Sequence, residues 1–239
     1  MKKITFAVCL ALGGISIANA ADHATKDIVQ WTPNTWNEAQ QTMPKGDASV
    51  GEKLHNSLFC ASCHGAKGEA MTNNWPSLAG QRATYTYKQL LDYQSNLRHE
   101  DERAHIMGVI AQTMDKQQMA DLAAFYAAQP LPCPQGLAKP APALVRVGDP
   151  KRLITPCAAC HGANGQGGIN ETTSLRGMPK EYFIRTMELF RDGHRHNDTA
   201  RGMSQFAQPL TDAEIEMLAD YYACDAKPTA AQPTAALSK

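Results

Sequence analysis

The spacing of apolar residues predicts a helix at the end of each half of the chain. Between Met119 and Tyr126 the apolar residues fall three and four positions apart, which places them on one helical face, and the segment from Ile215 to Tyr222 repeats the pattern. Each segment follows a helix start signal, because Asp115 precedes Gln118 by three residues and Thr211 stands in the same relation to a glutamate. We therefore expect two closing helices that begin at these capping residues.

The same two segments belong to a longer internal repeat. The stretch from Val50 to Ala128 is repeated from Val147 to the region of Tyr222, and several residues keep their spacing in both copies. We infer that one ancestral module was duplicated. Each copy reads as a short helix, a loop, a middle helix, a second loop and a closing helix, so the predicted fold is all-α. The matched residues are Gly51 and Gly148, Ser77 and Ser174, Leu78 and Leu175, Gly80 and Gly177, Tyr85 and Tyr182, Tyr93 and Phe190, Arg98 and Arg195, and His99 and His196.

The segments outside the repeat differ from it in composition. Lys2 and Lys3, an apolar run and the small residues of Ala18-Asn19-Ala20 have the order of a secretory signal and its cleavage site, which predicts export to the periplasm. No later stretch approaches the roughly 18 apolar residues of a membrane-spanning helix, so we expect no membrane span. The predicted organisation is a signal peptide at 1–20, an N-terminal extension at 21–47, a first module at 48–130, a Pro-rich linker at 131–145, a second module at 146–225 and a disordered tail at 226–239.

Charge excludes one class of partner. The 239 residues carry 23 basic and 23 acidic side chains, and the sequence has no basic stripe of the kind that binds nucleic acid. The extension adds two large aromatic residues, Trp31 and Trp36, without a helical or strand pattern around them. We expect these tryptophans either to cover a seam of the first module or to dock a partner.

A C-x-x-C-H motif stands near the start of each module. Its two thiols, one helical turn apart, can form thioethers with the vinyl groups of a haem, while the imidazole binds the iron. A zinc site and a thioredoxin-like dithiol are the other interpretations, but a zinc ribbon needs no histidine after each pair, and a redox dithiol needs a βαβ pattern. The motifs therefore predict two covalently bound haem c groups. Their residues are Cys60, Cys63 and His64 in the first module and Cys157, Cys160 and His161 in the second.

Each module resembles a small class I cytochrome c, and the tandem resembles the dihaem cytochrome c4 family. The likeness is carried by the two motifs, the run from Pro76 to Gln81, the aromatic pairs Phe125-Tyr126 and Tyr221-Tyr222, and one methionine in the second loop of each module. It implies all-helical domains, covalent haem and electron transfer. It also assigns the carbonyl of Pro76 to the ring N–H of the first motif histidine. The second module has Thr173 at that position, so we expect the two reduction potentials to differ.

The sixth iron ligand decides whether a haem carries electrons or binds substrate, since a methionine thioether fills that position and raises the reduction potential. Met107 and Met203 each stand seven residues before the matched positions Met114 and Leu210. We therefore expect Met107 and Met203, together with the two motif histidines, to be the iron ligands. Met114 is an alternative, but leucine cannot bind iron at its counterpart. His105 is another, and a His/His haem would have a much lower potential.

Two cysteines remain after haem attachment, Cys133 and Cys224. Each falls just beyond a closing helix, and an oxidising compartment tends to pair leftover thiols. We expect a disulfide between them. The alternative is two separate thiols, which needs only that their Cα atoms lie more than about 7 Å apart.

These features favour a periplasmic dihaem carrier that passes single electrons from a redox protein donor, a dehydrogenase, to a terminal acceptor such as a membrane-bound oxidase. An alternative is a dedicated electron-accepting subunit of one oxidoreductase complex, such as a thiosulfate dehydrogenase, for which the extension would add partner surface. A third interpretation is a dihaem enzyme of the peroxidase or thiosulfate dehydrogenase type, which needs an open or unusual iron position.

Overall fold

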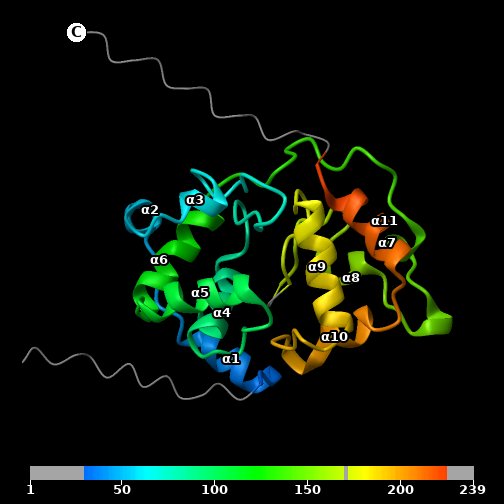
Figure 1. Cartoon of the computed structure of the whole chain (residues 1–239), viewed down its shortest axis with the longest axis horizontal. Coiled ribbons are helices and arrows are strands. Elements are labelled where there is room, and N and C mark those ends of the chain that lie inside the picture. Colours follow the sequence, from blue (N-terminus) through cyan, green and yellow to red (C-terminus); the bar gives the residue numbers. More distant parts are fainter. Residues whose placement is uncertain (1–29, 170–171, 225–239) are drawn as a thin grey trace, which may run out of the picture.

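The computed structural model describes residues 30–169 and 172–224, which form two helical modules lying side by side (Figure 1). These residues contain no β-strand, and their one isolated β-bridge joins Asp149 to Ile154. The all-α prediction is therefore confirmed. In the described part of the chain, no helix is both long and apolar enough to cross a membrane. The predicted signal peptide and tail lie outside the described residues.

The first module is built around its closing helix. The capping box predicted at Asp115 and Gln118 is present, and the helix that follows it presents Met119, Leu122 and Tyr126 to the core. Its first helix crosses the closing helix at Gly51, where any side chain would collide with the backbone of the closing helix. The helices of this module are α2 (Ala48–Ser57), α3 (Ala61–His64), α4 (Ala83–Gln94), α5 (Glu102–Gln112) and α6 (Lys116–Ala127).

The second module repeats this plan, with a shorter helix of six residues where the first module has α5. Its closing helix also starts at the predicted capping box, where Thr211 and Glu214 bond reciprocally, and buries Ile215 and Leu218 in a separate core. The closing helix packs against the middle helix, as in the first module. The elements are α7 (Ala143–Arg146), η1 (Pro150–Arg152), α8 (Cys157–His161), α9 (Lys180–Arg191), η2 (Thr199–Arg201), α10 (Gly202–Ala207) and α11 (Asp212–Tyr222).

One predicted element is wrong in the second module. We expected a short helix to run into each motif, but α7 ends at Arg146, well before Cys157. Gly148 follows with a φ of 74°, a left-handed conformation that ends a helix, and Pro150 then starts only one 3₁₀ turn. In the first module the left-handed residue is Phe59, directly before the motif, and α2 continues to Ser57.

The second loops are also partly helical, contrary to expectation. Met107 lies within α5, which starts at Asp101, because the carboxylate of Asp101 accepts the N–H of Ala104 and caps the helix. Met203 lies within the six-residue α10. This helix is shorter because the residues that precede it take left-handed conformations, which interrupt a right-handed helix.

The extension contains a helix that the sequence pattern did not indicate. Thr32 and Thr35 form a capping box, and Pro33 at the first position starts α1 (Pro33–Gln41). Trp31 and Trp36 are 5% and 4% exposed and belong to the core of the first module. Of the two roles expected for the tryptophans, covering the first module is confirmed. Figure 1 shows α1 reaching from beneath α4 toward α10, and α1 contacts η2 of the second module.

The linker is tied to the second module. Cys133 and Cys224 form a disulfide with a Cα–Cα distance of 5.9 Å, which confirms the predicted bridge and rules out two separate thiols. Leu137 and Ala141 of the linker pack against the core of the second module. The bridge therefore fixes the path of the chain between the modules.

Candidate haem-binding site

One continuous cavity of about 370 Å³ extends across both modules. Both C-x-x-C-H motifs line it, since α3 and α8 bring them to its walls. The structure thus gathers every predicted haem-binding residue around a single space. These residues are Cys60, Cys63, His64 and Met107 from the first module and Cys157, Cys160, His161 and Met203 from the second.

Each motif histidine is held by a backbone carbonyl. His64 Nδ1 donates to the carbonyl of Pro76 at 3.1 Å, and His161 Nδ1 donates to that of Thr173 at 2.8 Å. The contact thus survives the change from proline to threonine. Burial lowers the pKa of both imidazoles, which favours their neutral form. His64 Nε2 is buried without a hydrogen-bond partner, so its lone pair is available to a metal.

The motif thiols are not paired with one another. Cys60, Cys63, Cys157 and Cys160 are free, and burial raises the pKa of Cys60 and of Cys157. No group of three or more His, Cys, Asp or Glu residues in the described ranges is arranged to hold a metal ion, so the zinc interpretation has no ligand set there. The βαβ surroundings of a redox dithiol are missing as well, because the same ranges contain no strand. The unpaired thiols and the free His64 nitrogen fit covalent haem.

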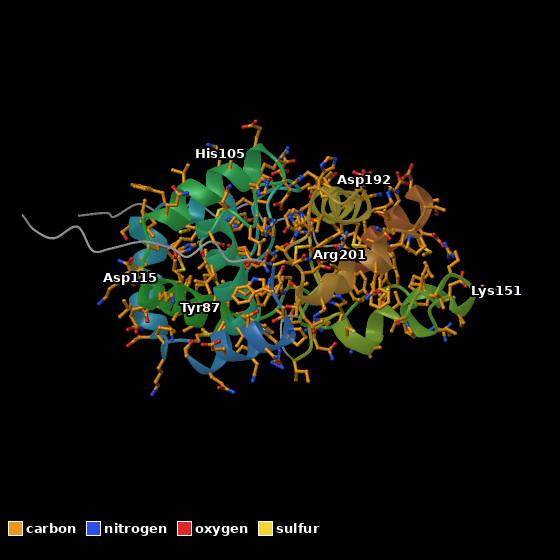
Figure 2. All side chains as sticks on the ribbon, turned by 90° about the horizontal axis from the view of Figure 1, so that it is seen from below. Tyr87, His105, Asp115, Lys151, Asp192 and Arg201 are labelled. Carbon is orange, nitrogen blue, oxygen red and sulfur yellow. A yellow bond between two sulfur atoms is a disulfide. The ribbon has the colours of Figure 1, made fainter. Side chains whose placement is uncertain are left out.

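The two predicted methionines reach the cavity from corresponding helices. Met107 on α5 and Met203 on α10 line it, and both are half-buried. Met114 also lines the cavity, but it is only 1% exposed and packs in the core of the first module. His105 is exposed on the outside of that module (Figure 2) and does not line the cavity. The placement agrees with the predicted methionines and sets His105 apart from the cavity, but Met107 as the ligand in place of Met114 stays a prediction.

Two buried arginines give the cavity wall its positive charge. Arg98 and Arg195, matched in the internal repeat, are 6% and 4% exposed and line the cavity. The amide oxygen of Gln89 accepts from both guanidinium groups, at 3.0 and 3.2 Å. A haem carries two carboxylates, which bind guanidinium groups through charge-assisted hydrogen bonds. Arg103 and Arg185 also line the cavity. Arg98 and Arg195 are the buried cationic groups that could receive these carboxylates.

The wall is not symmetric, because Glu100 has no acidic counterpart. Glu100 pairs with Arg98 at 2.5 Å and its side chain is 3% exposed, whereas the matched residue of the second module is Asn197. Burial alone raises the pKa of the Glu100 carboxyl, but Arg98 and Arg195 outweigh burial and hold this pKa at about 2. At neutral pH position 100 thus carries a buried negative charge that the matched position 197 of the second module lacks.

Sequence reasoning missed several residues that support the site. The repeat already paired Arg98 with Arg195, and this signal could have identified them. His55 gave no signal, because position 152 of the second module is an arginine. Its buried ring lies 2.9 Å from the hydroxyl of Tyr126, whose side chain lines the cavity. Only the folded chain shows this contact.

Two helical modules that each bring a C-x-x-C-H motif to a common cavity define a c-type cytochrome with two covalently bound haems. The cytochrome c4 of Thiocapsa roseopersicina is 34% identical over 181 residues, which cover 74% of this chain and 91% of that protein. The chain belongs to the dihaem cytochrome c4 family and is an electron-transfer protein.

Other comparisons agree with this assignment. The cytochrome c family model matches residues 48–127, and the model of cytochrome c oxidase, cbb3-type, subunit III matches residues 153–221. The reduced cytochrome c4 structure from Pseudomonas stutzeri has a TM-score of 0.64 at 29% identity and covers 74% of this chain and 97% of its own. The thiosulfate dehydrogenase electron acceptor of Stutzerimonas stutzeri is 31% identical, over 75% of this chain and 88% of that protein.

Proposed function

We propose that this protein is a periplasmic electron carrier that takes single electrons from a dehydrogenase and delivers them to a terminal acceptor. The observation that carries the proposal is the shared cavity. The predicted ligands of both haems line one continuous space that crosses the boundary between the modules. An electron that enters through one module can therefore leave through the other without crossing solvent.

The ligand sets support a carrier without bond chemistry of its own. When bound, each haem supplies an iron that alternates between its ferric and ferrous states. We assign one imidazole and one thioether to each iron, from His64 and Met107 in the first module and from His161 and Met203 in the second. Two filled axial positions leave no place for peroxide or thiosulfate, so the protein is not an enzyme by itself.

The chain's own residues prepare the site for electron transfer. Pro76 and Thr173 fix the orientation of the imidazoles through their carbonyls. Buried Arg98 and Arg195 offset carboxylate charge in a region shielded from water. Ligands that are already in place change little between the two oxidation states, which keeps the cost of each electron transfer low.

A second candidate is the electron-accepting subunit of a single dehydrogenase. The similarity to a thiosulfate dehydrogenase electron acceptor favours it. The extension, however, no longer does, because Trp31 and Trp36 are buried in this chain and offer no aromatic surface to a partner. A test by deleting the extension would therefore damage the core of the first module instead of removing a docking site.

Stopped-flow kinetics with the purified dihaem protein separates these functions. A carrier should accept electrons from more than one periplasmic dehydrogenase and be reoxidised by membranes that contain a terminal oxidase. A dedicated subunit should be reduced fast only by the catalytic subunit of thiosulfate dehydrogenase with thiosulfate present. Turnover of thiosulfate or peroxide by the protein alone, at on the order of 10 per second, would contradict both functions and identify the protein as an enzyme.

A further inference from the structure

The extension contacts the part of the second module that carries Met203. Trp31 is 5% exposed, and its indole Nε1 donates to Asp92 on α4 at 2.5 Å. Its backbone carbonyl accepts the N–H of Ala200 in η2 at 3.3 Å. The neighbouring Gln30 donates from its side chain to the carbonyl of His196 at 3.3 Å. One residue of the extension thus joins the middle helix of the first module to the turn that precedes α10.

A buried polar network continues from Asp92 to this turn. Asp92 is fully buried and accepts from Lys88 at 2.8 Å and from Asn197 of the second module at 2.6 Å. The next residue, Asp198, accepts the backbone N–H of Ser204 at 2.8 Å and its hydroxyl at 2.9 Å. Ser204 directly follows Met203. The contacts therefore run without a gap from Trp31 to the residue beside the predicted ligand.

The turn that precedes α10 is strained, although Asp198 bonds to Arg201 and to Ser204 within it. Ala200 and Arg201 have φ values of 53° and 57°, and two successive non-glycine residues in the left-handed region are unfavourable. Such a conformation persists only where surrounding contacts hold it. The bond from Ala200 to Trp31 is one such contact. Arg201, labelled in Figure 2, is exposed.

The corresponding segment of the first module lies in a regular helix with its own capping residue. Ala104 stands three residues before Met107, as Ala200 stands three before Met203, but it lies inside the regular helix α5. Its N–H is satisfied by Asp101 of the same module at 2.7 Å. Met107 is thus carried by a capped helix of eleven residues, whereas Met203 follows a strained turn and lies in a helix of six.

We propose that Trp31 is a positioning residue for the second haem: anchored on Asp92, it holds the turn at Ala200 that presents Met203 to the iron. This inference rests on the proposed assignment of Met203 as an iron ligand. It makes the extension a strap by which the first module controls the iron–sulfur bond of the second. The first haem does not depend on this strap.

Competition by imidazole, which displaces a methionine from ferric haem, tests this arrangement in the oxidised holoprotein. Trp31→Ala should raise the imidazole affinity of one haem by on the order of tenfold, since the turn can then relax away from the iron. Trp31→Phe keeps an aromatic ring and removes only the bond to Asp92, so it should give a smaller rise, and it carries the test if the alanine variant does not fold. Arg82→Ala is the matched control, because Arg82 donates across the modules to the carbonyl of Gly168 but does not line the cavity and makes none of the Trp31 contacts.

Variants at Met203 show which haem responds. In a Met203→Ala background the iron of the second haem is already open, so adding Trp31→Ala should leave the remaining imidazole titration, that of the first haem, unchanged. Equal changes at both haems, a change at the first haem alone, an equal effect of Arg82→Ala, or no change in either Trp31 variant would overturn the inference. Failure of the ligand assignment looks different, because Met203→Ala alone would then leave the methionine–iron absorption band intact.

Discussion

Gln81 of the first module bonds to Ser174 of the second module in both directions. The Gln81 side chain donates to the Ser174 carbonyl at 2.8 Å and accepts the Ser174 N–H at 2.9 Å. Its oxygen also accepts the hydroxyl of Thr173 at 3.0 Å, and the carbonyl of Thr173 orients His161. The first module therefore braces the histidine side of the second haem, in addition to the strap on the methionine side.

Replacing Gln81 should affect the second haem selectively. Gln81→Met introduces the residue found at the repeat counterpart, Met178, and removes the acceptor of the N–H of buried Ser174. We expect a loss of about 1–3 kcal/mol in the free energy of unfolding, measured by guanidinium titration. A redox titration should show a changed potential for the second haem only. Met178→Leu is the control and should cost less than about 1.5 kcal/mol. A change in the reduction potential of the first haem alone would show that Gln81 does not support the second haem.

Removing either predicted methionine should remove about half of the weak band near roughly 695 nm that marks methionine bound to ferric haem. Met107→Ala and Met203→Ala should each have this effect, and the double variant should lose the band. Met114→Leu should retain it, because Met114 is a core residue that is 1% exposed. If Met107→Ala keeps the full band while Met114→Ala or His105→Ala alters the spectrum, the ligand of the first haem is assigned wrongly.

The disulfide should be complete in the purified holoprotein. Mass spectrometry after unfolding and alkylation without reductant should find no adduct on Cys133 or Cys224. Because the bridge closes a loop with a sequence separation of 91, replacing both cysteines by serine should lower the free energy of unfolding. The expected loss is about 4–5 kcal/mol on the chain-entropy model. Two adducts per chain, or equal stability of the serine variant, would count against the bridge.

Glu100 should make the protein sensitive to acid. The pKa of this carboxyl is about 2 in the folded chain and 4.5 without the fold. A depressed folded pKa contributes stability above pH 4.5 and loses it as the pH falls toward 2. The contribution should be about 2–3 kcal/mol at neutral pH. Unfolding measured between pH 6 and pH 2 should show a smaller acid-dependent loss in Glu100→Gln. An unchanged pH dependence in that variant would contradict the assignment.

Glu100→Gln should also raise the reduction potential of the first haem. One buried negative charge at about 10–15 Å, with an effective dielectric constant near 20, stabilises ferric iron by on the order of 50 mV. Glu214→Gln is the control, since Glu214 pairs with Arg152 and does not line the cavity. Spectroelectrochemistry should show one shifted and one unshifted haem in Glu100→Gln and two unshifted haems in the control. A shift in the reduction potential of the second haem alone would show that Glu100 does not act on the first haem.

The sequence by itself determined the local features of this protein. A C-x-x-C-H motif specifies haem attachment through a spacing of one helical turn, and the capping boxes at Asp115 and Thr211 specify helix starts, because each depends only on neighbouring residues. The duplication likewise showed in residues at constant spacing. The repeat did not reveal that Gly148 and Pro150 prevent a helix from running into the second motif, since a repeat aligns residue types and not backbone conformations.

Tertiary structure decided how the two modules act on each other. Trp31 and Gln81 meet their partners across long stretches of chain, and no local pattern encodes which buried donor will face which acceptor. Assigning four cysteines to haem left Cys133 and Cys224, but the sequence did not decide between a bridge and two separate thiols. Only packing could bring these two residues to bonding distance. Each module follows from local sequence, but the asymmetry between the haem sites arises at their interface, where burial strengthens every charge and hydrogen bond.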